Sequence, residues 1–202
     1  MNSEESHEFQ ISDNFSFLHE QDGDNIKICN EEFGTLLLTV NDLESWNEFG
    51  FFKAVIVNTF REFLAVFPEN DQAEFIEEHQ IERISFLMKI YRSTSSDDGI
   101  SVAFTIIING EIYSMFCTDQ MQIAFKKGDC PARIDGNTSN MIFFKKIFNK
   151  SDPDVFSFES SLQKGYYLAF IEENGRRKLG LKKGQDDVDN TQAFDVHLET
   201  DS

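Results

Sequence analysis

The sequence has few basic residues for its length. Its 202 residues contain 18 Lys and Arg against 36 Asp and Glu, which gives a formal net charge of −18. Proteins bind the phosphate backbone through clustered Lys and Arg, so this imbalance argues against nucleic acid as a partner. It favours a partner with a basic surface, which a negatively charged protein attracts over some distance.

Cysteines are few, and long apolar runs are missing. Cys29, Cys117 and Cys130 are widely spaced and odd in number, so they cannot form a closed disulfide framework, which favours synthesis in a reducing compartment. The first twenty residues contain no basic segment followed by an apolar one, so we expect no secretory signal. Apolar runs such as LLLTV are too short to span a membrane, so we expect no membrane insertion.

Motifs for catalysis and for cofactor or metal binding are also missing. The sequence contains no P-loop, GxGxxG, GxSxG, HExxH or CxxC pattern, and its four His residues are scattered. Asp186, Asp187 and Asp189 form an acidic cluster, but they lack the alternating ligands, the glycine and the terminal Glu of a calcium-binding EF-hand loop. We interpret this cluster as a solvated loop. The sequence therefore predicts a protein that is not an enzyme and that needs no cofactor or metal.

Phenylalanine and short apolar runs are abundant instead. The chain has 22 Phe and is 40% hydrophobic, enough for a sizeable aromatic core. Helical periodicity is weak, although residues 69–80 could hold one short helix. The short apolar runs predict twelve strands, near 49–58, 63–67, 74–77, 83–92, 100–108, 111–117, 122–127, 141–146, 155–160, 167–171, 178–181 and 192–197. Many short strands separated by turn residues are typical of an all-β barrel or sandwich.

Two local patterns support these strands. Asn109-Gly110 separates two apolar runs and predicts a tight hairpin, because a type I′ turn needs positive φ at both central residues. The segment FSFESSLQKGYYLAF (156–170) predicts two strands joined by a polar stretch. Its candidate core residues are Phe156, Phe158, Tyr167 and Phe170. The runs ISFLMKIY, MIFFKKIF and FSFESSL resemble one another faintly, but these letters alone do not establish an internal repeat.

The N-terminal segment differs in composition from the rest. Residues 1–42 hold ten acidic residues and one basic residue, Lys27, a net charge of −9 and half of the chain's total. Its runs NFSFLH and TLLLTV can form strands, but their acidic, Asn- and Ser-rich surroundings favour partial order at best. We therefore expect a partly ordered acidic segment over 1–42 and a barrel domain over 43–202. Trp46 then falls outside the predicted barrel strands.

Basic residues occur in short groups within this acidic chain. The groups are Lys126-Lys127, Lys145-Lys146, Arg176-Arg177-Lys178 and Lys182-Lys183. On an alternating strand one member of each pair faces outward. Two interpretations remain open: a solvated face with local ion pairs, or a positive docking patch for an acidic partner surface.

Three C-terminal segments resemble a known family. NMIFFKKIF (140–148), FSFESSLQKGYYLAF (156–170) and RRKLGLKKG (176–184) match, in order and spacing, the C-terminal third of the interleukin-1 family, and within it the interleukin-18 branch. Weaker similarity extends back to about Phe49. The resemblance implies a β-trefoil with twelve short strands in three pseudo-repeats, in agreement with the independent strand count.

The resemblance also implies a way of acting. Members of this branch are pro-inflammatory cytokines, made as cytoplasmic precursors and cut after an Asp by an inflammatory caspase. After unconventional release to the extracellular space, the mature domain bridges receptor chains with immunoglobulin-like domains. This triggers inflammatory and interferon-γ signalling, and a soluble decoy binding protein can intercept it. By this resemblance the chain is a monomer with an N-terminal propeptide.

Few individual residues carry over from the family. In the family the cleavage Asp ends a segment like L-E-S-D, but in this chain Trp46 occupies the position of that Asp. The nearest substitute is Asp42, so the predicted cut lies between Asp42 and Leu43. Among receptor-contact positions Lys126 keeps its basic character, and Asn140 replaces an acidic residue. Lys145, in the basic pair that follows, is the third candidate contact.

A binding module of another kind is the alternative. An intracellular β-trefoil lectin or protease inhibitor would share the fold. Lectin trefoils repeat an aromatic and polar sugar-binding set in each third, and Trp46, the single tryptophan, lies outside the predicted barrel. Heparin-binding trefoils need a strongly basic surface, which the net charge of −9 over residues 43–202 disfavours.

Overall fold

The chain divides into two compact units, Met1–Leu43 and Glu44–Ser202. The computed structural model describes residues 7–11, 15–22, 25–30, 34–39, 44–70, 72–77, 81–94, 99–149, 151–185 and 187–198. The predicted cleavage residues Asp42 and Leu43 lie outside this set. No helix within it is long and apolar enough to cross a membrane.

The first unit contains a four-stranded antiparallel sheet in the order β1-β2-β3-β4. Its strands are β1 (His7–Ile11), β2 (Phe15–Asp22), β3 (Asn25–Asn30) and β4 (Gly34–Thr39). The runs NFSFLH and TLLLTV fall largely in β2 and β4. Both apolar runs of the acidic segment are therefore strands.

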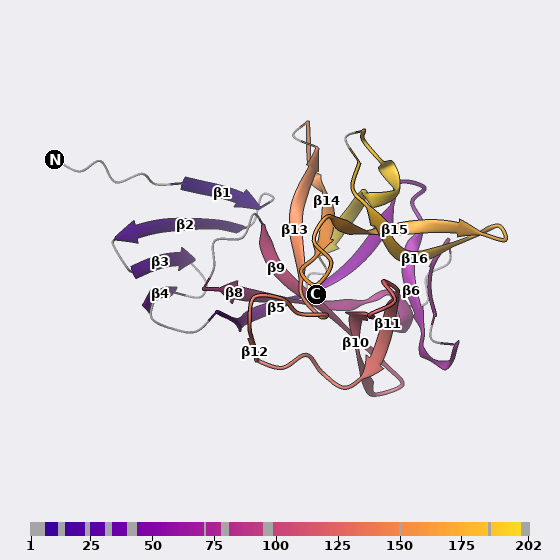
Figure 1. Ribbon diagram of the computed structural model, residues 1–202, viewed down its shortest axis with the longest axis horizontal. Coiled ribbons are helices and arrows are strands. Elements are labelled where there is room, and N and C mark those ends of the chain that lie inside the picture. Colours follow the sequence, from indigo (N-terminus) through magenta and orange to yellow (C-terminus); the bar gives the residue numbers. More distant parts are fainter. Residues whose placement is uncertain are drawn as a thin grey trace. The chain divides into compact units, whose positions relative to one another are not determined.

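The second unit is built almost entirely of strands (Figure 1). They are β5 (Ser45–Asn58), β6 (Phe63–Phe67), β7 (Gln72–Ile76), β8 (Phe86–Ser93), β9 (Ile100–Ile108), β10 (Glu111–Cys117), β11 (Ile123–Lys127), β12 (Arg133–Asp135), β13 (Phe143–Asn149), β14 (Asp152–Ser160), β15 (Tyr166–Glu173), β16 (Arg176–Lys183) and β17 (Phe194–Leu198). Its short helical turns are η1 (Pro68–Asn70), α1 (Ile81–Ile84) and η2 (Asn190–Gln192). All twelve predicted strands are confirmed, and β12 is an additional short strand between β11 and β13.

Strand pairing shows a closed barrel. Following the antiparallel ladders, β5 pairs with β8, β8 with β9, β9 with β13, β13 with β14, β14 with β17, and β17 with β5 again. The remaining predicted strands form three hairpins, β6-β7, β10-β11 and β15-β16. Each third of the unit therefore reads barrel strand, hairpin, barrel strand. This arrangement is a β-trefoil: it confirms the barrel that the strand count favoured and the trefoil that the family resemblance implied.

The three thirds place a Phe at an equivalent buried position. Phe86 begins β8, Phe143 begins β13 and Phe194 begins β17, and each is almost fully buried in the barrel core. Phe104 and Phe158 lie among them, with ring centres 5.2 Å apart in an edge-to-face arrangement. The faint likeness of ISFLMKIY and MIFFKKIF thus reflects equivalent strands, β8 and β13.

The predicted hairpins are confirmed. Asn109 and Gly110 both have positive φ, 52° and 78°, as a tight β9-β10 turn requires. Segment 156–170 forms the adjoining parts of β14 and β15, with Glu159 opposite Tyr167. Its predicted core residues Phe156, Phe158 and Phe170 are buried, and Tyr167 is half-buried.

Two local details are decided by the structure. Residues 72–76 form strand β7, in agreement with the strand predicted at 74–77 and not with the helix that 69–80 could have held, because burial alternates with period two and puts Ala73 and Phe75 inside. Strand β5 begins at Ser45 rather than Phe49, because ladders to β8 and β12 both extend to that end. Trp46 is therefore a fully buried strand residue, not one outside the barrel strands, and offers no exposed indole to a sugar.

Candidate functional site

A loop over the outer face of the barrel is fixed by several hydrogen bonds to neighbouring strands. Residues 128–132, here called the strap, connect β11 to β12. At its start the Ser114 hydroxyl of β10 donates to the Gly128 carbonyl at 2.6 Å. At its end the Glu48 backbone N–H of β5 donates to the Ala132 carbonyl at 2.7 Å. Both ends are thus tied to barrel or hairpin strands.

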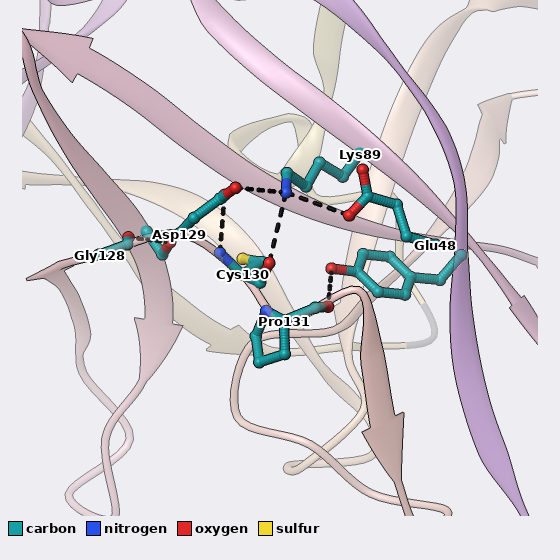
Figure 2. A network of polar contacts seen from close by, with 8 residues as sticks. Glu48, Lys89, Gly128, Asp129, Cys130 and Pro131 are labelled. Carbon is teal, nitrogen blue, oxygen red and sulfur yellow. Dashed lines mark hydrogen bonds and ion pairs between the residues drawn. The ribbon is translucent and has the colours of Figure 1, made fainter.

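Lys89 holds the centre of the strap (Figure 2). Its side chain leaves β8 toward the strap, because its neighbours Met88 and Ile90 turn into the barrel. The ammonium group lies 2.8 Å from Asp129 Oδ2, 3.2 Å from Glu48 Oε2 and 3.3 Å from the Cys130 carbonyl. One buried cation therefore joins β5, β8 and the strap.

The charge on Lys89 is stabilised by these partners. Burial alone would lower the pKa of this lysine, but hydrogen bonds to Asp129 and Glu48 outweigh burial and raise the pKa above its usual value. Glu48 and Asp129 remain partly exposed, with side-chain exposures of 23% and 47%. The cation is thus desolvated while both carboxylates still reach water.

Tyr91 supplies the remaining anchor. Its hydroxyl donates to the Pro131 carbonyl at 2.7 Å, and burial raises the pKa of the phenol, which keeps it a donor at physiological pH. With this bond, each of the five strap residues has a polar contact to β5, β8 or β10. The strap is therefore held at every residue, through backbone carbonyls at four of them and through the side chain at Asp129.

A second, smaller core lies around the strap and the outer face of the barrel. It consists of Trp46, Tyr91, Ala103, Cys130, Ile142 and Phe144. The Trp46 indole N–H donates to the Ser101 hydroxyl at 3.2 Å, so its polar atom is satisfied although the ring is fully buried. Burial raises the pKa of the Cys130 thiol and keeps it protonated. These residues stabilise the site and offer no reactive group.

Two of the predicted contact residues border the β10 strand that the strap also contacts. Lys126 lies opposite Ser114 in the β10-β11 ladder; it is exposed and has no ion-pair partner among the described residues. Asn140 is also exposed, and its carbonyl accepts a hydrogen bond from the Cys117 N–H of β10 at 2.7 Å. Both side chains are free to meet a partner, and β10 supports both.

Lys145 lies in a different environment. It is buried on β13, where its ammonium group sits 3.6 Å from the centre of the Phe156 ring. Burial lowers its pKa to about 8, partly offset by the nearby charge of Asp154. It takes the place in its third of the barrel that Met88 takes in the first. Lys145 therefore presents little surface to a partner.

Most of the other basic side chains form local ion pairs. Lys127 pairs with Glu111, Lys146 with Glu159, Arg176 with Glu74, Arg177 with Glu62, Lys178 with Glu173, and Lys182 with Asp189. Such pairs neutralise charge where it stands. Of the two interpretations of the basic groups, the structure favours local ion pairing; Lys126 and Lys183 are the exposed members without an ion pair among the described residues.

The acidic cluster that we interpret as a solvated loop is only partly described by the structure. Asp186 lies outside the described part of the chain, and Asp189 accepts hydrogen bonds from the Thr191 N–H and hydroxyl while pairing with Lys182. No group of three or more His, Cys, Asp or Glu side chains in that part is arranged to hold a metal ion. Asp189 instead caps the η2 turn.

Sequence reasoning did not identify the strap or its anchors. The available signal was Lys89 itself, a lone charge within the apolar run ISFLMKIY. Buried charges are usually paired, but nothing in the sequence shows that Glu48 and Asp129, about forty residues away on either side, pair with Lys89.

Comparison with known proteins places this geometry in context. A model of the family described as Interleukin-1 / 18 matches residues 63–193. Interleukin-18 of Gallus gallus is 40% identical over 114 residues, covering 54% of this chain and 58% of that protein. Interleukin-18 of Bos taurus is 34% identical over 111 residues, 55% of each, and that of Homo sapiens 32% over 117 residues, 58% of each. The match thus spans a little over half the length of these relatives.

Solved structures agree on the fold. The crystal structure of chicken interleukin 1 beta superposes with a TM-score of 0.57 at 14% identity, covering 75% of this chain and 98% of the other. At this identity the likeness concerns the fold alone. The family match covers well over half of the chain and coincides with the trefoil derived from strand pairing. The chain therefore belongs to the interleukin-1 / interleukin-18 family.

Proposed function

We propose that this chain is the precursor of an interleukin-18-type cytokine. Its mature domain binds and bridges receptor chains with immunoglobulin-like domains, and so triggers inflammatory and interferon-γ signalling. The observation that carries the proposal is the family match over residues 63–193, which lies on a complete β-trefoil. The mechanism is binding without catalysis: a closed barrel holds loops and hairpins in fixed positions for a partner surface.

The same proposal covers processing and location. The precursor resides in the cytoplasm, an inflammatory caspase cuts it between Asp42 and Leu43, and the product acts outside the cell as a monomer. A soluble decoy binding protein of the interleukin-18 type is a further expected partner. The net charge of −9 over residues 1–42 supports a role for this segment in latency, because it opposes approach of an acidic receptor surface.

For receptor contacts we propose Lys126 and Asn140 as residues that touch the receptor directly. Both are exposed, and Lys126 is not neutralised by a described carboxylate. An unpaired lysine of this kind favours an acidic patch on the receptor. Lys145 contributes indirectly, because its buried side chain packs on the Phe156 ring and helps fix β13 between β9 and β14.

The maturation step is tested on the full chain. Purified precursor and its Asp42→Ala variant are incubated with an inflammatory caspase, and the N-terminus of the product is sequenced. We expect a product beginning at Leu43 from the natural chain and no cut in the variant. A product with any other N-terminus overturns the assignment of Asp42.

Receptor binding is tested with the cut and uncut protein side by side. Immobilised ectodomains of interleukin-18-type receptor chains should capture the caspase-treated protein more tightly than the Asp42→Ala variant. Lys126→Ala should weaken capture by about tenfold, the loss of one desolvated charge contact. Lys164→Ala, which removes another exposed lysine in the loop between β14 and β15, serves as the matched control. Failure of the treated protein to bind any such ectodomain refutes the proposed function.

A further inference from the structure

The strap is held from one side only. Its polar groups point toward the barrel: the carbonyls of Gly128, Cys130, Pro131 and Ala132 all accept hydrogen bonds from β5, β8 or β10. Its outer side is open, since Pro131 and Ala132 are exposed. A segment of five residues without regular structure thus has a fixed backbone and an unoccupied outer surface.

We propose that Lys89 is a positioning residue for receptor recognition. It holds the strap in one conformation, so that the strap and the adjoining Lys126 form a preorganised contact surface for an acidic patch on an immunoglobulin-like receptor domain. This inference rests on the proposed function and adds to it a residue that acts without touching the receptor, because Lys89 is only 6% exposed.

The contacts of Lys89 explain why it has this role. Its ammonium group is bound by Asp129 and Cys130 of the strap and by Glu48 of β5, whereas Ser114, Tyr91 and the Glu48 N–H each make a single contact. Removing Lys89 therefore releases the middle of the strap, and the ends stay tied. Ordering a loop opposes binding unless the loop is ordered beforehand, so a fixed strap favours association.

The loss of Lys89 can be studied in a folded barrel, because its two carboxylate partners are not fully buried. Glu48 and Asp129 are partly exposed, so both carboxylates can be hydrated when Lys89 is replaced. Methionine has a similar length and fits the apolar surroundings of a buried strand residue. Lys89→Met should therefore leave the barrel folded while freeing the strap. Lys89→Arg keeps the charge and the donors.

The first experiment concerns the free chain. Hydrogen exchange is followed by mass spectrometry in the full chain and in Lys89→Met, Lys89→Arg and Lys127→Met, the last a control that removes an exposed lysine paired with Glu111. We expect exchange of the Cys130 amide, which donates to Asp129 Oδ1 at 2.8 Å, to quicken at least tenfold in Lys89→Met alone, with peptides of β9 and β14 unchanged. Unchanged exchange in the strap overturns the proposal.

The second experiment measures receptor capture after caspase treatment. Lys89→Met should bind about tenfold more weakly than the natural sequence, mainly through slower association, and Lys89→Arg should restore most of the affinity. Equal affinity of Lys89→Met, with a strap shown to be loosened, refutes the positioning role and leaves the proposed function intact. If the natural sequence binds no receptor, the proposed function fails and the positioning role fails with it.

Discussion

Two lysines of this chain, Lys89 and Lys145, are buried in different surroundings. Lys89 is ion-paired with two carboxylates, whereas Lys145 lies over the face of Phe156 and receives only weaker compensation from the nearby charge of Asp154. The pKa of Lys89 is raised and that of Lys145 is lowered, so the two lysines affect stability in opposite ways. Two lysines with the same side chain thus have opposite pKa shifts because different groups surround their ammonium groups.

Lys145→Met should stabilise the protein at neutral pH. Because the folded pKa of Lys145, about 8, lies below its ordinary value of 10.5, the unfolded chain binds more protons between these values, and the free energy of unfolding rises with pH across this window. Keeping Lys145 charged in the folded protein at pH 7 therefore costs about 3 kcal/mol at most. Methionine carries no charge, so Lys145→Met should raise the free energy of unfolding by up to that amount at pH 7.

The measurement is urea unfolding between pH 7 and 10.5. Lys164→Met, at an exposed loop lysine, is the control and should keep the pH dependence of the natural chain. If Lys145→Met retains that dependence, Lys145 is not its source.

Cys117 and Cys130 should be unreactive in the folded protein. Cys117 and Cys130 are buried as free thiols, and burial raises both pKa values, which lowers the thiolate fraction. Iodoacetamide followed by peptide mass spectrometry should label neither peptide natively and both in denaturant. Native labelling of the Cys130 peptide would mean that the strap opens readily.

At the level of elements, a tight hairpin turn restricts which residue can occupy it without loss of stability. Gly110 has a φ of 78°, which residues with a Cβ adopt only at a cost of about 1 kcal/mol or more. Gly110→Ala should reduce the free energy of unfolding by about that amount. Gly50→Ala is the control, since its added Cβ would meet no atom within 4 Å and its φ is not positive. Thermal unfolding of both variants compares them directly.

The strands could be predicted from the sequence, but the site could not. Alternation of apolar residues and turns such as Asn109-Gly110 are local signals, and they located twelve strands and the β9-β10 hairpin. Strand β12 escaped notice because three residues, Arg133 to Asp135, carry no periodicity. Lys89 joins Glu48 and Asp129 only through tertiary folding, and no local pattern records such a contact. Resemblance supplied Lys126 and Asn140, yet it could not reveal that Lys145 is buried.

For the molecule as a whole, net charge limits its partners. With −18 overall and local ion pairs on most basic groups, the full chain should not bind heparin or DNA at about 0.15 M salt. It should pass through a heparin column under these conditions and be retained on an anion exchanger. Retention on heparin would mean that Lys126 and its neighbours form a larger positive surface than the ion pairs allow.

The intrinsic fluorescence of the buried Trp46 can report on the strap without an added label. It is the single tryptophan of the chain, and it packs with Cys130 of the strap instead of lying in the main barrel core. Its emission therefore responds to water entering beneath the strap, whereas circular dichroism follows the strands of the barrel. A difference between the two signals during titration with denaturant, or on adding a receptor domain, would separate local detachment from global unfolding without any label.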